Sequence, residues 1–192
     1  QLCEHIHLPF QAGSNKILKM MRRGYTREEY LQKVEQLREV VPEIAITADV
    51  IVGFPGEEEE DFEQTLDLIK RVRFDGLFSF KYSPRKGTLA SRWPDNVPEP
   101  IKAKRLEKLQ NLQRKITLEK NKALEGKVLE VLVDGCGERE GQLRGRSRCN
   151  RVVNFMGPLD FIGKIVWVKI KEGLPNCLRG ELILEEKEVL YA

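Results

Sequence analysis

The sequence predicts an α/β domain that forms the C-terminal half of a partial (β/α) TIM-like barrel, followed by a small antiparallel β-barrel of the OB-like kind. Strand-like and helix-like segments alternate up to about residue 82, which is typical of right-handed βαβ units around a parallel sheet. Only about three such strands are present, fewer than a complete barrel needs. After about residue 123, short strands separated by turns replace this alternation. We therefore expect domains over residues 1–123 and 124–192.

The first elements are defined by capping signals. Residues 5–10 predict a strand, and the turn that follows leads into a helix with Ser14 as its expected N-cap. A second helix is expected after Thr26, which forms a capping box with Glu29. Apolar residues recur at helical spacing from there until Pro42 ends the segment.

The central strand is an almost continuous apolar run over residues 44–54, rich in β-branched side chains. This pattern predicts a parallel strand buried on both faces, ending at the glycine-rich turn of residues 53–56. Residues 57–72 begin with acidic side chains and continue as an amphipathic helix. The run of acids in its first turn is expected to be solvated.

The last elements of the first domain are a strand over residues 77–82, a loop over 83–88 and a long basic helix over 98–122. Apolar side chains recur along one face of that helix, namely Leu106, Leu109, Leu112 and Ile116. The second domain is predicted to contain five short strands, over residues 127–133, 142–148, 151–155, 164–171 and 179–184.

Composition restricts the class of protein. The longest apolar runs fall well short of the roughly 20 residues that a membrane helix needs. The formal net charge of +3 is too small to identify a nucleic-acid binder. The four cysteines are widely scattered, which favours free thiols in a reducing, cytoplasmic compartment. Because the chain opens with Gln1 and no methionine, we expect it to be part of a longer protein.

Asp49 is a carboxylate inside an apolar strand, where an unpartnered charge would cost several kcal/mol. It is therefore expected to face a pocket, where ribose hydroxyls are natural donors to it. The alternative is a salt bridge to a neighbouring arginine such as Arg23, which could also bind a ligand carboxylate with its planar guanidinium.

The turn Gly53-Phe54-Pro55-Gly56 follows a buried strand and precedes a helix, where glycine lets a ligand approach the backbone. The acidic residues that follow would repel a phosphate, so a neutral adenine edge is the better ligand. The alternative is a plain turn between strand and helix.

Cys3, His5 and His7 alternate, so three potential zinc ligands would share one face of a strand. The alternative, which we favour, is that these side chains fill or rim the barrel interior. No metal site is predicted.

Arginines are concentrated in one segment of the second domain, although residues 124–192 contain 11 basic and 11 acidic side chains. Small β-barrels that bind oligonucleotides use such a strand face against phosphates, with amides near the bases. We expect an RNA-binding surface formed by Arg144, Arg146, Arg148, Asn150, Arg151 and Asn154. The alternatives are a solvated arginine face, or RNA binding on the basic helix that contains Lys102, Lys104, Arg105 and Lys108.

Several strings of the sequence resemble the radical S-adenosylmethionine methylthiotransferases. They are His5-Ile-His-Leu-Pro-Phe-Gln-Ala-Gly-Ser14, Met20-Met-Arg-Arg-Gly-Tyr-Thr26, Asp49-Val-Ile-Val-Gly-Phe-Pro-Gly-Glu57, Asp61-Phe-Glu and Tyr82-Ser-Pro-Arg-Lys-Gly-Thr88. The segment Gly145-Arg-Ser-Arg-Cys-Asn-Arg-Val-Val-Asn-Phe155 is similar to the RNA-binding TRAM domain that ends these enzymes. It is most like the tRNA 2-methylthioadenosine synthase branch and less like the branch that modifies a ribosomal-protein aspartate.

The resemblance implies that the parent enzyme transfers a methylthio group to C2 of an isopentenylated adenosine beside the tRNA anticodon. It implies S-adenosylmethionine, two 4Fe–4S clusters, a reductant and the tRNA anticodon stem-loop as cofactors and partners. None of the four cysteines has the spacing of the family's cluster ligands, so no catalytic residue is expected in this chain. A non-catalytic RNA-binding fragment and the ribosomal-protein branch are the alternatives.

The resemblance also implies roles for single residues around S-adenosylmethionine. Arg23 would bind the methionine carboxylate, and Asp49 and Gln11 would bind the ribose hydroxyls. Gly53, Phe54 and Pro55 would line the adenine. A contact between Glu57 and the cofactor is left open, because the glutamate of the superfamily's looser pattern is displaced here.

Overall fold

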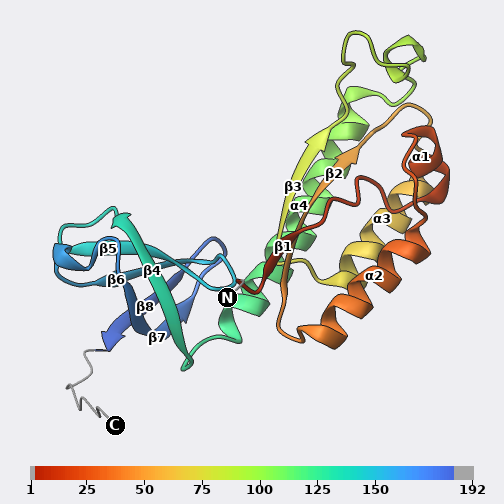
Figure 1. The fold of residues 1–192 in the computed structure, drawn as a ribbon. Coiled ribbons are helices and arrows are strands. Elements are labelled where there is room, and N and C mark those ends of the chain that lie inside the picture. The colour runs from red at the N-terminus through yellow and green to blue at the C-terminus, as the bar shows by residue number, and fades with distance from the viewer. Residues whose placement is uncertain (1–2, 184–192) are drawn as a thin grey trace. The chain divides into compact units, whose positions relative to one another are not determined.

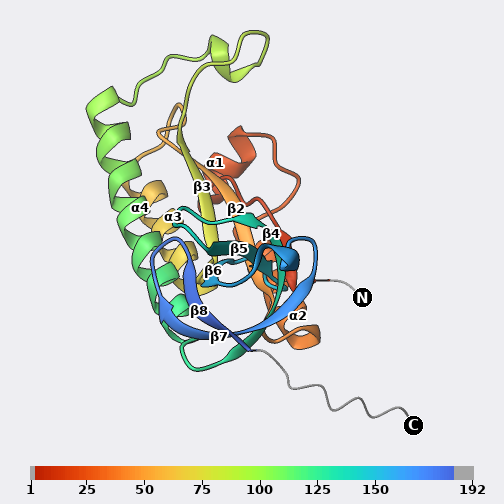
Figure 2. The same cartoon turned by 90° about the vertical axis from the view of Figure 1, so that its left-hand side faces the viewer.

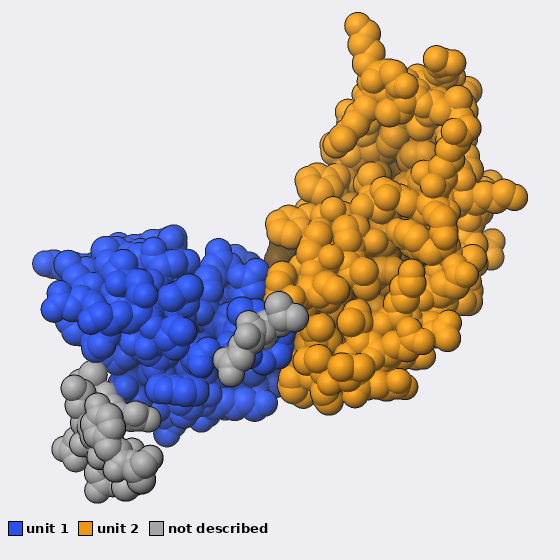
Figure 3. Space-filling model, viewed as in Figure 1, with its two compact units in different colours: residues 1–4, 117–192 blue, residues 5–116 orange. Residues whose placement is uncertain are grey.

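The computed structural model describes residues 3–183, and the chain divides into two compact units (Figures 1 and 3). Residues 5–116 form the first, here called the sheet unit, and residues 1–4 with 117–192 form the second, here called the barrel unit. This division lies within the long helix α4, and the expected boundary between residues 123 and 124 stays a prediction. No helix within the described residues is long and apolar enough to cross a membrane.

The sheet unit is built on three parallel strands, as predicted, and their order in the sheet is β1-β2-β3. They are β1 (His5–His7), β2 (Ala45–Val52) and β3 (Gly76–Lys81). The first strand is shorter than expected, because only Gln11 continues the pairing, as an isolated bridge to Val50.

Four helices accompany the sheet: α1 (Asn15–Met20), α2 (Arg27–Val40), α3 (Glu59–Val72) and α4 (Glu99–Lys122). A 3-10 turn, Ala90–Arg92, lies in the segment between β3 and α4. The capping box at the start of α2 is confirmed, with the Thr26 amide donating to Glu29 Oε2 over 2.7 Å and the Glu29 amide to Thr26 Oγ1 over 3.2 Å. Ser14 is the N-cap residue of α1, as predicted, although its side chain makes no capping hydrogen bond.

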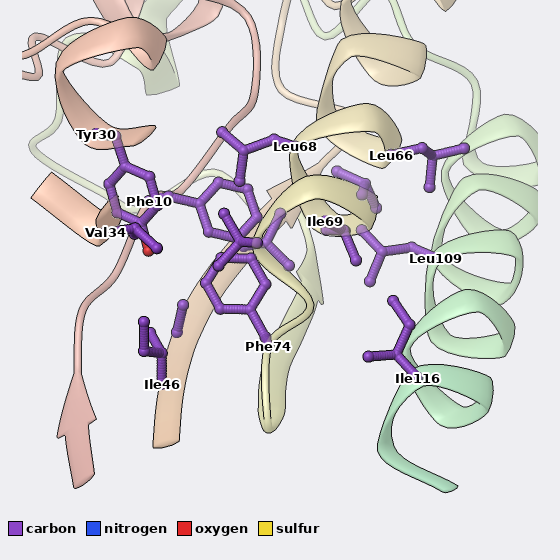
Figure 4. Close-up of a cluster of buried hydrophobic side chains, with 14 of the residues drawn as sticks. Phe10, Tyr30, Val34, Ile46, Leu66, Leu68, Ile69, Phe74, Leu109 and Ile116 are labelled. Carbon is purple, nitrogen blue, oxygen red and sulfur yellow. The ribbon is translucent and has the colours of Figure 1, made fainter. Parts of the chain in front are cut away.

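The core of the sheet unit lies on one face of the sheet, where α2, α3 and α4 cover it (Figure 4). Ala48, Val50 and Val52 of β2 point into this core, and Leu109 and Ile116 of α4 complete it. The expected apolar face of α4 is therefore confirmed. The alternate residues of β2, namely Thr47, Asp49 and Ile51, are only partly buried, so the prediction of burial on both faces is wrong for the described chain.

The barrel unit is a closed five-stranded barrel in the order β4-β5-β6-β8-β7 (Figure 2). Its strands are β4 (Val128–Cys136), β5 (Gln142–Ser147), β6 (Val152–Met156), β7 (Ile165–Gly173) and β8 (Leu178–Ile183), with a 3-10 turn at Leu159–Phe161. Four of the five strand pairs are antiparallel, but β6 and β8 pair in parallel. The expectation of a wholly antiparallel barrel is corrected at that pair, because β7 lies between them in the sequence and β8 returns in the direction of β6.

Candidate cofactor site and nucleic-acid interface

The face of the sheet opposite the helices carries polar and aromatic side chains. Thr47 Oγ1 lies 3.1 Å from His5 Nε2 and 3.0 Å from His7 Nδ1, so one hydroxyl contacts both imidazoles. Burial lowers the pKa of His5, and its ring is therefore neutral at pH 7. The His7 and Phe78 rings meet edge to face with their centroids 5.9 Å apart. This open face combines hydrogen-bonding groups with an exposed apolar surface.

Asp49 lies on this open face of β2, with 34% of its side chain exposed. Its Oδ2 atom is 3.5 Å from His7 Nε2. Within the described residues it makes no salt bridge to an arginine, so the predicted alternative of an Arg23 partner is wrong. The carboxylate is accessible to a ligand, as the pocket interpretation requires.

Gln11 lies beside Asp49 because of its backbone hydrogen bonds. Its amide donates to the Asp49 carbonyl over 2.9 Å, and its carbonyl accepts from the Ile51 amide over 2.9 Å. Gln11 has a φ of 66°, in the left-handed region that non-glycine residues seldom occupy. The bridge to β2 thus brings two of the predicted cofactor residues to neighbouring positions.

Arg23 is exposed and follows the end of α1. Its amide donates to the Leu18 carbonyl over 2.9 Å, which fixes the backbone after the helix. In the part of the chain that the structure describes, its guanidinium forms no ion pair, so its charge is available to an anionic ligand.

The turn of residues 53–56 packs against other side chains of the sheet unit. Gly53 has a φ of +71°, and a Cβ built on it would lie 2.3 Å from Cγ of Lys102, so a side chain could not be accommodated. Phe54 is buried between Tyr82 and Trp93, with ring centroids 5.1 Å and 6.0 Å away. Pro55 is buried as well. The side chains of Phe54 and Pro55 therefore contribute to packing.

Glu57 fixes this turn by hydrogen bonding at both ends. Its amide donates to the Phe54 carbonyl over 2.9 Å, and its Oε1 atom accepts from the Gly53 amide over 2.8 Å. The same oxygen accepts from Arg105 Nη1 of α4 over 2.8 Å, in an ion pair whose side chains are 2% and 7% exposed. Burial raises the pKa of Glu57, while the Gly53 amide and Arg105 oppose that rise. Glu57, left open as a cofactor contact, is thus a buried structural residue.

Arg105 and Lys102 are the residues that sequence reasoning misjudged. Both are buried on the core side of α4, and Lys102 Nζ lies 2.5 Å from Asp95. They share the helical stripe of Leu109 and Ile116, and that spacing was the signal that could have revealed their burial. Neither can bind RNA from this position, so the basic-helix alternative retains only Lys104 and Lys108, the latter paired with Glu63.

Asp61 is also buried, so the prediction that the acidic run is a solvated first turn is wrong at this residue and at Glu57. Asp61 Oδ1 accepts from the Ser14 hydroxyl over 2.6 Å, and its Oδ2 accepts from the Glu58 amide and from Lys16 Nζ, each over 3.0 Å. Burial alone would raise the pKa of Asp61, but these three donors outweigh it and leave the pKa below its usual value. This explains why the Ser14 side chain makes no capping hydrogen bond in α1.

Metal ligands are not assembled in the described part of the chain, where no three His, Cys, Asp or Glu side chains form a group that could hold an ion. His5 and His7 contact Thr47 instead, and no zinc site arises from Cys3, His5 and His7. An iron–sulfur cluster does not fit the residues present.

The predicted RNA-binding residues lie around β5 and β6 of the barrel unit. Arg144 and Arg146 alternate outward on β5, and their Nε atoms lie 3.0 Å and 3.6 Å from the carboxylate of Asp134. Arg148 follows the strand and pairs with Glu4 over 2.8 Å and with Glu130 over 3.5 Å. The arginine face is therefore largely neutralised by carboxylates.

The amides and the last arginine occupy the turn and the next strand. Asn150 is exposed in the left-handed conformation with a φ of 61°, and the carbonyl of Arg151 accepts from the Ser147 amide over 3.0 Å. Asn154 on β6 pairs in register with Arg144 on one side and Arg179 on the other. Arg179, which sequence reasoning missed, thus extends this row onto β8.

Comparison with known proteins agrees with this architecture. Residues 2–69 match the family model of the radical SAM superfamily, and residues 122–183 match that of the TRAM domain. The chain is 56% identical over 187 residues to the tRNA-2-methylthio-N(6)-dimethylallyladenosine synthase of Syntrophus aciditrophicus (strain SB), covering 97% of this chain and 41% of that protein. The proteins of the same name from Syntrophobacter fumaroxidans (strain DSM 10017 / MPOB) and Thermoanaerobacter sp. (strain X514) are 55% and 53% identical, over 95% of this chain and 40% and 39% of theirs. The chain spans about two fifths of the length of the curated relatives it matches, and the predicted resemblance to the radical SAM methylthiotransferases is confirmed.

Replacing Asp61 by asparagine is expected to lower the free energy of unfolding by about 2 kcal/mol at pH 7, because three donors lose a charged acceptor. Since the folded-state pKa of Asp61 lies below its unfolded value, its contribution is present above about pH 4 and is lost as the pH falls through the folded value. Urea denaturation between pH 7 and pH 3 should show the two proteins converging in acid. Glu60→Gln, at an exposed position of α3, is the control and should change stability by less than about 0.5 kcal/mol. A gap between Asp61→Asn and the unaltered protein that stays constant with pH would contradict this assignment.

Proposed function

We propose that this chain is the part of a tRNA methylthiotransferase that binds S-adenosylmethionine and tRNA, in an enzyme that makes the nucleoside named in its relatives, 2-methylthio-N(6)-dimethylallyladenosine. The observation that supports it best is the accessible carboxylate of Asp49, next to Gln11, on the open face of a parallel sheet within the radical SAM match. We further propose the anticodon stem-loop as the tRNA region bound, the cytoplasm as the compartment, and a reductant as a partner of the whole enzyme.

The proposed cofactor residues act by binding and orientation. Asp49 and Gln11 bind the ribose hydroxyls, Arg23 binds the methionine carboxylate, and the backbone of Gly53, Phe54 and Pro55 lines the adenine. When bound, S-adenosylmethionine supplies the radical chemistry that an unactivated adenine C–H bond requires. The accessibility of Asp49 and Arg23 fits this ligand.

The proposed RNA-binding residues are Arg144, Arg146, Arg148 and Arg151 toward phosphates, with Asn150 and Asn154 nearer bases or sugars. Carboxylates already pair with three of these arginines, which reduces the free energy that a phosphate gains by binding them. Asp134 accepts a hydrogen bond from Arg144 and forms an ion pair with Arg146, so a phosphate must compete with it for the same guanidinium groups.

In the full-length enzyme, Asp49→Ala is expected to weaken S-adenosylmethionine binding by about 1.5 to 3 kcal/mol, the range for a hydrogen bond to a charged group. Arg23→Ala should have an effect of similar size. Equilibrium binding, with thermal unfolding measured in parallel, tests both. Thr47→Val, which changes a neighbour of Asp49 on β2 that is not a proposed contact, is the control. Unchanged affinity in Asp49→Ala together with reduced thermal stability would assign Asp49 a structural role instead.

Two opposite changes test the RNA face. The double variant R144Q/R146Q should bind tRNA more weakly and lower the slope of log K against log salt by roughly 0.7 to 0.9 for each phosphate that is no longer neutralised. Asp134→Asn leaves both arginines in place without their carboxylate and should bind more tightly. Both can be measured by fluorescence anisotropy at several salt concentrations. Identical slopes in all three proteins would place tRNA recognition outside this face.

A further inference from the structure

One segment of the sheet unit carries positive charge that no described residue neutralises. The sequence from Ser83 to Pro94 contains three basic residues, Arg85, Lys86 and Arg92, and no acidic residue. All three basic side chains are exposed, and none forms an ion pair with any residue in the described part of the chain. This segment, here called the basic loop, therefore differs from the barrel face, where Asp134 forms ion pairs with both strand arginines.

The basic loop has a defined local structure. The carbonyl of Arg85 accepts from the Thr88 amide over 3.1 Å and from the Thr88 hydroxyl over 2.8 Å, which closes a turn around Gly87 at a φ of +89°. The Ser91 hydroxyl donates to the Thr88 carbonyl over 2.7 Å at the start of the 3-10 turn. These bonds reduce the conformational entropy that a ligand would have to remove on binding.

Both ends of the basic loop are anchored on the turn proposed to line the adenine. Tyr82, immediately before the loop, and Trp93, within its last residues, each meet the Phe54 ring edge to face. A little further on, the Asn96 side chain accepts from the Gly56 amide over 2.8 Å. Figure 1 shows the loop extending beyond the end of β3, at the carboxyl end of the sheet. This is the end at which parallel α/β sheets bind their ligands.

We propose that the basic loop is a second RNA-docking surface, on which Arg85, Lys86 and Arg92 contact the phosphates of the substrate stem-loop next to the cofactor turn. The inference rests on the proposed function, since it assigns part of tRNA binding to the sheet unit. Three exposed cations without carboxylate neighbours match the chemistry of a nucleic-acid backbone, which needs positive charge and little geometric precision. The loop holds RNA and is not part of the cofactor contacts.

The test compares the 192-residue chain with its variant R85Q/K86Q/R92Q for binding to an anticodon stem-loop RNA at several salt concentrations. We expect the variant to bind about tenfold more weakly at low salt, with a salt slope smaller by about 2, because three phosphates no longer have a cationic partner. The matched control is K33Q/K70Q/K115Q, which removes three other exposed lysines of the sheet unit that make no ion pair in the described chain. Its slope should equal that of the unaltered chain, and circular dichroism should show all three proteins folded.

The outcomes separate this inference from the proposed function. If the unaltered chain and R85Q/K86Q/R92Q bind with the same slope while R144Q/R146Q binds more weakly, the basic loop proposal is overturned and tRNA binding by the barrel stands. If the control variant loses as much slope as the loop variant, the attraction is diffuse charge and the loop is no docking surface. If the unaltered chain binds no RNA, both proposals fail. Poly-L-glutamate competing as well as the RNA does, at equal charge, would assign the loop to an acidic polypeptide instead.

Discussion

The buried ion pair between Glu57 and Arg105 is the interaction on which the arrangement of the candidate site depends. Arg105 Nη1 donates to both the carbonyl and the carboxylate of Glu57, and that carboxylate also accepts from the Gly53 amide. Replacing a buried ion pair with apolar groups is often neutral or stabilising, so stability alone does not account for this one. The ion pair fixes the position of the turn after β2, because it joins that turn to a helix nearly fifty residues further along the chain.

That constraint extends outward through packed rings. With its backbone fixed by Glu57, Phe54 lies between Tyr82, immediately before the basic loop, and Trp93, near the end of that loop. Lys102 lies against Gly53 and has its ammonium 5.5 Å from the centroid of the Tyr82 ring. The turn proposed to line the adenine and the loop proposed to hold RNA are thus supported by the same face of α4. A disturbance of that face is expected to affect both proposed ligands.

The sequence was sufficient to predict what local patterns determine. Spacing alone predicts the capping box of Thr26 and Glu29, the parallel direction of the strands and the apolar stripe of α4. The structure contains all three. Charged residues were predicted less well, because a lysine or glutamate is exposed by default unless a distant partner is known. Asp61 is buried and bonds to Ser14 and Lys16, and Arg105 is buried and bonds to Glu57. Each of these partners lies more than forty residues away in the sequence. The arginines of the barrel are a further example. The local sequence predicts a basic face, but Asp134 and Glu130 neutralise much of its charge.

Amide hydrogen exchange at Gly53 tests most directly whether Glu57 holds the turn. In Glu57→Ala the Gly53 amide loses its acceptor, and its exchange rate should rise strongly relative to the amide of Ile51 in the preceding strand β2, which donates to the Gln11 carbonyl. Glu59→Ala is the matched control, because Glu59 also pairs with Arg105, over 3.1 Å, but is exposed and does not contact Gly53. Unchanged protection of Gly53 in Glu57→Ala, or an equal decrease of protection in both variants, would contradict the account.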